Sequence, residues 1–294
     1  MEYKLENHVL SVTFQTLGGA LHSIQTREDG LEYLWKGEKQ YWSGQAPVLF
    51  PICGSIRDDR ARTAGGKELH MPRHGIVRKR EFECREQTED SILFTIESDE
   101  ETYQMFPYHF RLGILYRLEE NRIVTEYLVE NTGEEEMPYF IGGHPGFNCP
   151  LFPDEEYQDY RIEFEQEETC TVPRPVTETG LIDMEHRTEF LSGQRSLPLS
   201  HTLFEKDAVI LDSLKSRRVR LCSGRHDRGV ELTFEGFPYL ILWSSANSGP
   251  FVALEPWTGL STCSDEGDVF EEKRNVQSAG AGEIRKYAYT ITVY

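Results

Sequence analysis

The chain has 294 residues, of which 50 are acidic and 31 are basic, so its formal net charge is −19. A field of this sign repels nucleic-acid phosphates and anionic membranes, so we expect neither as a partner. No apolar run reaches membrane-spanning length, and the charged start of the chain lacks the apolar segment of a secretory signal. These features favour a cytoplasmic protein.

Most of the chain has the pattern of short β-strands separated by turns. Residues 9–14, 91–96, 111–116 and 122–127 are β-rich runs, several of them alternating between apolar and polar side chains. Further strands are predicted at residues 160–164, 208–211, 218–222, 229–234, 239–243, 251–255 and 286–293. Helical periodicity is almost absent. The pattern predicts an all-β protein, a large sandwich of antiparallel strands.

No linker or low-complexity stretch divides the chain, so we expect a single domain over residues 1–294. The most irregular segment, residues 171–203, carries scattered prolines and polar residues. We interpret it as a long connection between strands.

Several kinds of functional site are disfavoured because their motifs are missing. The six cysteines form no C-x-x-C pair, and we expect them to be reduced and mostly buried. There is no P-loop, no G-x-S-x-G, and no G-x-G-x-x-G after a strand. No H-x-H or H-E-x-x-H spacing is present either, so a metal site remains the weaker alternative. We therefore expect no cofactor and no metal.

Two segments in the first third of the chain combine glycine or proline with a basic side chain. In residues 47–58 an apolar approach ends at Gly54 and then presents Arg57, which is suited to hydrogen bonding with sugar hydroxyls or a phosphate. The alternative is a surface salt bridge with Asp58 or Asp59. In residues 71–78, Pro72 and Gly75 flank His74, so the backbone is fixed before the histidine and free after it. The alternative is an ordinary loop histidine.

The most informative segment is residues 139–148, where a strand runs into Gly142-Gly143, presents His144 and continues with Pro145-Gly146. So many glycines carry a large ordering cost, which is tolerable where the backbone must approach something closely. Loops on a rigid β scaffold commonly carry chemistry, which makes His144 a candidate.

A carboxylate ends the apolar run at residues 251–255. Burial there raises the pKa of Glu255 toward that of a useful base, and Trp257 offers a flat face on which sugar C–H groups can stack. The alternative is a buried, salt-bridged glutamate beside a core tryptophan. Asp207 lies just ahead of another predicted strand and is a further candidate acceptor for hydroxyl hydrogen bonds.

Four short motifs together resemble a known family, the aldose 1-epimerases, and within it the shorter bacterial LacX-like branch. They are Pro-Arg-His-Gly at His74, Gly-Gly-His-Pro-Gly at His144, Glu-Lys-Asp-Ala at Asp207 and Leu-Glu-Pro-Trp-Thr-Gly at Glu255. Residues 17–24 fit as well, so the resemblance covers nearly the whole chain. It implies a galactose mutarotase-like supersandwich with an open cleft.

The resemblance also implies roles. His144 matches the family's general acid and Glu255 its general base, while His74 and Asp207 match substrate-binding positions. Arg57 matches the substrate-binding arginine, although many relatives have Gly-Arg where this chain has Gly54-Ser55. The Asn-Arg pair of the classical galactose mutarotases is missing, so a preference for galactose is not implied.

The implied activity is an isomerase reaction, the interconversion of α and β anomers of a free or phosphorylated sugar by general acid–base catalysis. Two rivals remain open. One is a non-catalytic carbohydrate-binding or regulatory protein on the same fold, and the other is a hexose-6-phosphate 1-epimerase. Arg57, Arg73 and Arg78 lie near the motifs and are available for a phosphate.

Overall fold

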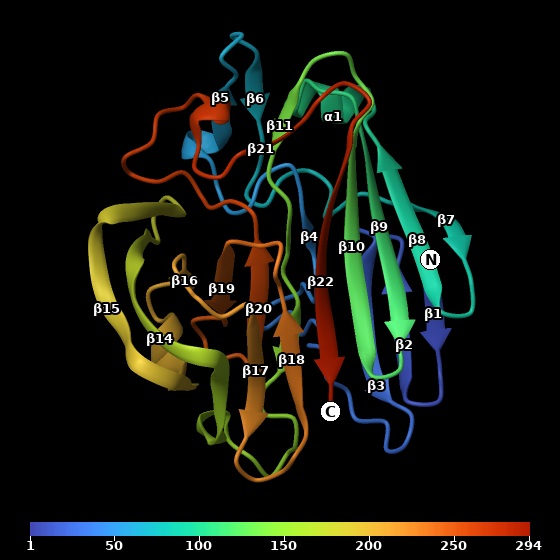
Figure 1. The fold of residues 1–294 in the computed structure, drawn as a ribbon, viewed down its shortest axis with the longest axis vertical. Helices are drawn as coiled ribbons and strands as arrows, with labels where there is room; N and C mark the ends of the chain where they lie inside the picture. Colours follow the sequence, from blue (N-terminus) through green and yellow to red (C-terminus); the bar gives the residue numbers. More distant parts are fainter.

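The largest element of the fold is a nine-stranded antiparallel sheet, seen in a computed structural model that describes residues 1–294 (Figure 1). From edge to edge its strands are β15 (Leu181–Pro198), β14 (Tyr160–Val176), β17 (Arg218–Ser223), β18 (Gly229–Thr233), β22 (Ile284–Val293), β10 (Arg122–Asn131), β9 (Phe110–Glu119), β8 (Ser91–Glu97) and β7 (Glu83–Gln87). The prediction of an all-β, antiparallel fold is confirmed.

A second sheet carries the centre of the molecule. Its order is β16 (Val209–Leu211), β19 (Tyr239–Trp243), β20 (Phe251–Trp257), β12 (Gly142–Gly143) and β4 (Val48–Leu49), and β13 (Gly146–Asn148) also pairs with β20. A three-stranded sheet contains β1 (Glu2–Glu6), β2 (Leu10–Gln15) and β3 (Ala20–Thr26). Two small pairs are β5 (Arg60–Arg62) with β6 (Glu68–His70), and β11 (Met137–Tyr139) with β21 (Gln277–Ala279).

Helix is confined to short pieces at the ends of strands. The α-helix α1 (Glu100–Met105) begins at Asp99, whose carboxylate accepts the Thr102 backbone N–H while the Thr102 hydroxyl accepts that of Asp99. This reciprocal cap satisfies two donors at the helix start. The 3₁₀ turns are η1 (Arg57–Asp59), η2 (Tyr157–Asp159), η3 (His201–Phe204) and η4 (Phe270–Glu272). No helix has the length and apolar character needed to cross a membrane.

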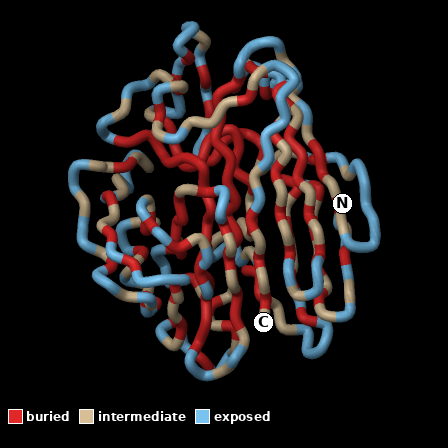
Figure 2. The backbone as a smooth tube through the Cα atoms, in the orientation of Figure 1, coloured by how far each residue is buried: buried red, intermediate tan, exposed pale blue.

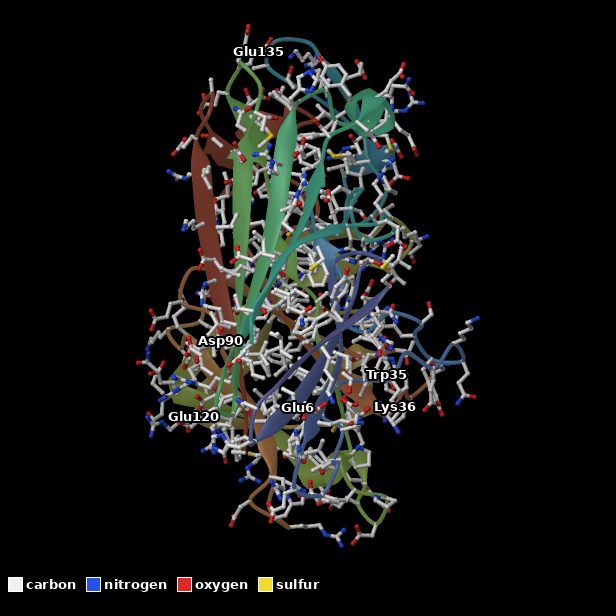
Figure 3. All side chains as sticks on the ribbon, turned by 90° about the vertical axis from the view of Figure 1, so that its right-hand side faces the viewer. Glu6, Trp35, Lys36, Asp90, Glu120 and Glu135 are labelled. Atoms are coloured by element: carbon white, nitrogen blue, oxygen red, sulfur yellow. The ribbon has the colours of Figure 1, made fainter.

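Strands of this protein form because their side chains alternate between a buried and a less buried face. Along β10 every second residue is buried, and β2 shows the same period. The inward faces join in one cluster of 74 buried hydrophobic residues, the red interior of Figure 2. In the side view of Figure 3, side chains fill the space between the sheets, and Glu120 and Glu135 label opposite ends of the long strands.

Strand β20 differs from the others because all seven of its residues are buried. It lies between β19 on one side and β12 and β13 on the other, in the middle of the second sheet. A glutamate on this strand is therefore withdrawn from water by the position of the strand itself. This placement creates the candidate site.

The prediction of an irregular connection over residues 171–203 is wrong. Strands β14 and β15 pair there as a long antiparallel hairpin with several register shifts. These irregularities, the prolines within the strands and the scarcity of buried residues in β15, three of 18, remove the alternation on which strand prediction depends. In Figure 1 the hairpin forms the yellow and olive arm at the left of the molecule.

All six cysteines are unpaired, as expected. Five are buried, and only Cys84 is partly exposed.

Candidate active site

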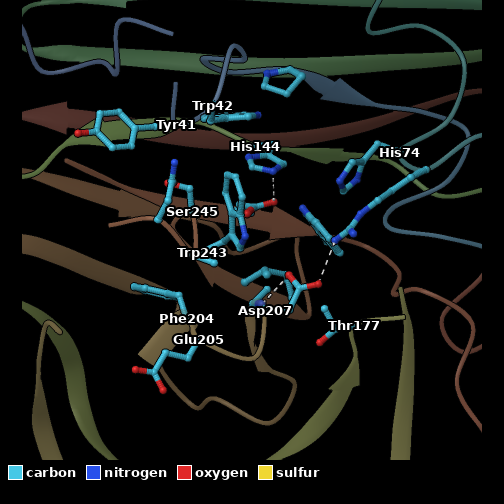
Figure 4. Close-up of a pocket in the computed structure, with 18 of the residues that line it drawn as sticks. Tyr41, Trp42, His74, His144, Thr177, Phe204, Glu205, Asp207, Trp243 and Ser245 are labelled. Atoms are coloured by element: carbon cyan, nitrogen blue, oxygen red, sulfur yellow. Dashed lines mark hydrogen bonds and ion pairs between the residues drawn. The ribbon is translucent and has the colours of Figure 1, made fainter. Parts of the chain in front are cut away.

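His144 and Glu255 face each other across two adjacent antiparallel strands. Gly142 pairs with Trp257 and Gly146 pairs with Ala253, so His144, midway between the two glycines, is directly opposite Glu255. Residues opposite each other in such a pair project from the same face of the sheet. The imidazole Nε2 lies 3.3 Å from the carboxylate Oε2, and Figure 4 shows this contact as a dashed line below His144.

The glycines before His144 are explained by a close approach, as predicted. A Cβ atom on Gly142 would lie 2.9 Å from Cδ1 of the Trp257 ring and 3.0 Å from the Cys53 sulfur. A larger residue would therefore push the histidine strand away from β20. The bare backbone at this position is what allows His144 to reach Glu255.

Burial acts on the two partners in opposite directions. Withdrawal from water raises the pKa of Glu255 well above its usual value, and the Arg73 guanidinium only partly offsets this. The same burial lowers the pKa of His144, to about 3. Both changes favour the uncharged forms. An uncharged acid beside an uncharged imidazole holds the same number of protons as a carboxylate beside an imidazolium, so the pair carries one transferable proton in either form.

The pair also has unmet hydrogen-bonding capacity. Glu255 Oε2 and His144 Nδ1 are buried without a hydrogen-bond partner in the protein. Since buried polar atoms are normally satisfied, such atoms at the floor of a cleft indicate a site that is completed by a ligand.

The backbone conformation of His74 is fixed by hydrogen bonds, and its ring supplies a donor to the same cleft as His144 and Glu255. The residue has a positive φ of 68°, and its N–H donates to the Gly54 carbonyl over 2.7 Å. The Gly54 N–H donates to His74 Nδ1 over 3.2 Å, so the ring proton lies on Nε2. Burial lowers the pKa of His74 well below its usual value and keeps the ring neutral. Gly75, at φ 78°, has no room for a Cβ, which would lie 2.1 Å from the Phe50 carbonyl oxygen.

Asp207 also has an unusual backbone, with a φ of 107° just ahead of β16. One carboxylate oxygen accepts the Ala208 N–H over 2.8 Å, and the other lies 3.8 Å from Arg73 Nη2. A non-glycine residue in this region is strained, and such strain is typical of functional positions.

A cleft of about 610 Å³ brings these groups together. Of the residues singled out from the sequence, it is lined by His74, His144, Asp207, Glu255 and Trp257. Arg73 and Arg78, whose nearness to the motifs was noted, also line it. Figure 4 shows His144, His74 and Asp207 arranged around one space.

The structure places Arg57 outside this cleft, contrary to the prediction of a substrate-binding role. Its Nε donates to Asp268 Oδ1 and its Nη2 to the Glu266 carbonyl, each over 3.1 Å. The reason is a turn at Asp58 and Asp59, both at positive φ, which directs Arg57 toward the loop before η4. Arg57 does form a surface salt bridge, but with Asp268 and not with Asp58 or Asp59 as the alternative interpretation had it.

Sequence reasoning missed the aromatic half of the cleft. The Trp42 ring stacks on the His144 imidazole, with centroids 4.7 Å apart and an interplanar angle of 27°. Trp243 meets Trp42 edge to face at 5.3 Å. Trp243 could have been found from the sequence. It lies two residues after Ile241 on the same face of β19, and Ile241 pairs with Glu255. Other missed lining residues are Tyr41, Pro47, Thr177, Phe204, Glu205, Ala208, Ser245, Ala246 and Asn247.

The arrangement fits proton transfer at two neighbouring oxygens of one ligand. A carboxyl group and an imidazole are in contact at the floor, and a second imidazole and a second carboxylate stand on the walls. No group of three or more His, Cys, Asp or Glu side chains is arranged to hold a metal ion.

The chain matches a family of known proteins. The model of the aldose 1-epimerase family matches residues 1–273 of the chain. The plasmid-encoded protein LacX of Lactococcus lactis subsp. lactis is 47% identical, over 100% of this chain and 99% of LacX. The chromosomal LacX of the same organism is 46% identical, with the same coverage. The chain belongs to the aldose 1-epimerase family.

Solved structures agree with this assignment. A galactose mutarotase related enzyme from Lactobacillus acidophilus superimposes with a TM-score of 0.94 at 27% identity, over 100% of this chain and 97% of that one. A galactose mutarotase-like protein from Lactobacillus casei has a TM-score of 0.89 at 28% identity, over 100% of both chains. The predicted galactose mutarotase-like supersandwich is therefore confirmed.

Proposed function

We propose that the protein is a mutarotase that interconverts the α and β anomers of an aldose. The observation that carries this proposal is the buried His144–Glu255 contact, 3.3 Å long, at the floor of a cleft. Interconversion of anomers needs one proton removed from the anomeric hydroxyl and one delivered to the adjacent ring oxygen. Two proton carriers in contact match two oxygens bonded to the same carbon.

The reaction follows from these positions. The Glu255 carboxylate takes the proton of the anomeric hydroxyl, the bond from C1 to the ring oxygen breaks, and His144 gives its proton to that oxygen. The open aldehyde then turns about its C1–C2 bond. Closure on the other face reverses both transfers, so the pair returns to its starting state. General acid–base assistance contributes roughly 10²–10⁴-fold per reaction, enough for a process that already occurs in water.

The remaining cleft residues are assigned to binding. His74 Nε2–H faces the cleft as a donor for a sugar oxygen, and Asp207 is an acceptor for hydroxyl groups. Trp257 forms part of the cleft wall, where sugar C–H groups stack on aromatic faces. The proposal needs no cofactor.

A phosphorylated sugar is the second candidate substrate, and one observation favours it. Arg78 lines the cleft, is partly buried, and makes no ion pair or side-chain hydrogen bond. Burial and the neighbouring Arg73 lower the pKa of Arg78, as expected for a cation that lacks an anion. In a chain with a net charge of −19, a cleft arginine without a carboxylate partner is suited to an anionic ligand.

The test is polarimetric. Crystalline α-glucose and α-galactose would be dissolved with and without protein, and the approach to anomeric equilibrium followed. We expect acceleration by the wild type and none above background by Glu255→Gln. Acceleration confined to hexose 6-phosphates, lost in Arg78→Ala, would assign the phosphorylated substrate. Tight sugar binding without acceleration would identify a non-catalytic binding protein.

Two broader properties belong to the same proposal. We expect the chain to act as one domain, since its single hydrophobic cluster draws on strands from both ends of the sequence. We also expect it to work in the cytoplasm on a small sugar, with neither nucleic acid nor a membrane as a partner.

A further inference from the structure

The candidate base Glu255 has a neighbour whose hydrogen-bonding group is unused. Trp257 lies two residues further along β20, so its side chain projects from the same face of the strand. The indole is only 5% exposed, and its Nε1–H is buried without a hydrogen-bond partner. An indole nitrogen can only donate, and a buried tryptophan N–H normally finds an acceptor.

Glu255 has the complementary deficiency. Its Oε2 is buried, contacts His144 and accepts no hydrogen bond. A carboxylate has about four acceptor positions, and ionisation without donors is costly in a buried place. The unpaired donor of Trp257 therefore lies beside the unpaired acceptor of Glu255.

The indole is held firmly in its place. Its Cδ1 would lie 2.9 Å from a Cβ on Gly142, and the His74 ring meets it edge to face at 5.5 Å. The backbone of Trp257 pairs with Tyr239 on one side and Gly142 on the other. Strand pairing on both sides fixes the backbone of Trp257, so a hydrogen bond between these two neighbouring side chains needs no rearrangement of the sheet.

We propose that the Trp257 indole N–H is the positioning donor for Glu255, which holds and stabilises the carboxylate form of the base. This role rests on the proposed function and differs from a stacking role toward sugar. Burial raises the pKa of Glu255, whereas Arg73 and the Trp257 indole lower it, although the indole contact lacks the alignment of a complete hydrogen bond. We infer that the bond becomes complete when Glu255 ionises.

Other charges around Glu255 stay in place when the indole is changed. From the neighbouring elements these are His144, His74, Arg73, Arg78 and Asp207, and the Cys53 thiol also lies close enough to interact with the carboxylate. The effect of a change at Trp257 on the base can therefore be measured against an unchanged set of charges.

The kinetic test is Trp257→Phe, which keeps an aromatic ring and removes the donor. Loss of one hydrogen bond to a carboxylate predicts a fall in kcat of roughly tenfold, with KM changed by less than about twofold. The acidic limb of the pH profile of kcat/KM should move to higher pH by about one unit. Trp35→Phe changes a buried tryptophan that does not line the cleft and also removes an indole donor, so it is the matched control and should leave that limb in place. A Trp257→Phe variant with a raised KM and an unmoved limb would overturn the proposal and leave only stacking.

A second measurement needs neither turnover nor a folded variant at Trp257. The chain has four tryptophans, so a ¹⁵N–¹H spectrum of the wild type should contain four indole signals. One of them should shift as Glu255 ionises, and no signal should show this titration in Glu255→Gln. If all four signals behaved identically in both proteins, the inference would fail. A titrating signal in a protein without mutarotase activity would keep the inference and reject the proposed function.

Discussion

Two histidine–glutamate pairs in this protein contain a buried glutamate, and they are built in opposite ways. At the cleft, His144 and Glu255 contact each other at 3.3 Å and leave Nδ1 and Oε2 without partners. Away from the cleft, His226 Nε2 lies 3.0 Å from Glu155 Oε2, and both carboxylate oxygens and both ring nitrogens of this pair are hydrogen-bonded.

The second pair is a closed network. Glu155 accepts a bond from the Ser223 hydroxyl over 2.8 Å and another from the Tyr160 hydroxyl. His226 accepts the Arg228 N–H at Nδ1 over 3.0 Å, which leaves Nε2–H to donate to Glu155. Burial raises the pKa of Glu155, but the hydrogen bonds from Tyr160, Ser223 and His226 outweigh it, so the net change is downward.

The difference separates a structural pair from the proposed catalytic one. A carboxylate with both oxygens hydrogen-bonded stabilises the folded chain and has little capacity left for a substrate. An unsaturated carboxylate costs stability, and its raised pKa makes it a better base. The two pairs share their residue types and a buried glutamate. They differ in the burial of the histidine, since His226 is only partly buried, and in the number of satisfied hydrogen bonds.

The largest expected effect is the loss of turnover in Glu255→Gln. This change keeps the shape of the side chain and removes its basicity, so we expect kcat to fall by roughly 10³-fold while sugar binding stays within a fewfold of wild type. Polarimetry gives the rate, and calorimetric titration with sugar gives the affinity. His144→Asn should behave similarly, whereas the matched change Glu155→Gln should leave the rate per folded molecule unaltered. A Glu255→Gln variant with a kcat near that of the wild type would contradict the distinction drawn between the two pairs.

A smaller effect is expected for Asp207→Ala, which removes a wall residue and leaves the pair intact. Loss of a charged hydrogen-bonding partner for a sugar hydroxyl predicts a fall in kcat/KM of roughly tenfold or more, expressed mainly as a raised KM. Steady-state polarimetry over a range of sugar concentrations separates the two parameters. A normal KM with a lowered kcat would instead place Asp207 among the groups that act on the reacting atoms.

In the Glu155–His226 pair, we expect substitution to change the stability of the fold. Glu155→Gln loses a charged acceptor that holds three side chains, so we expect the free energy of unfolding to fall by about 1–3 kcal/mol in urea titrations. Because the pKa of Glu155 is lowered by folding, its contribution is present above the unfolded pKa near 4.3 and is lost as the pH falls through the folded value. The gap between wild type and variant should therefore narrow below about pH 4.

The sequence pointed to the proposed catalytic pair and gave no sign of the Glu155–His226 pair, for a physical reason. His144 and Glu255 sit in segments where glycine, proline and an apolar run constrain the backbone, and those constraints are local in sequence. Glu155 and His226 come from ordinary polar loops that are 71 positions apart and meet only through folding. Nothing local marks such a pair.

The same distinction explains the other outcomes of sequence prediction. Strands with one buried face, such as β8, β9 and β10, were found because alternation is a local pattern. The β14–β15 hairpin was missed because bulges and exposure erase that pattern. Arg57 was misplaced because its direction depends on a turn at positive φ and on a loop some 200 residues later. Trp42 was missed because it contacts His144 only through the path of its loop in the folded chain.

The smallest expected effect is also the one most specific to the comparison, a gain of stability in Glu255→Gln. Folding raises the pKa of Glu255, so the folded state favours the protonated carboxyl and loses stability as the pH rises from the unfolded pKa near 4.3 toward the folded value. A neutral amide avoids this loss. We expect Glu255→Gln to match wild type near pH 4 and to be more stable by about 1 kcal/mol at pH 7, measured as the free energy of unfolding in urea. The trend with pH is opposite in sign to that of Glu155→Gln. Equal and parallel losses in both variants would mean that Glu255 is a structural residue like Glu155.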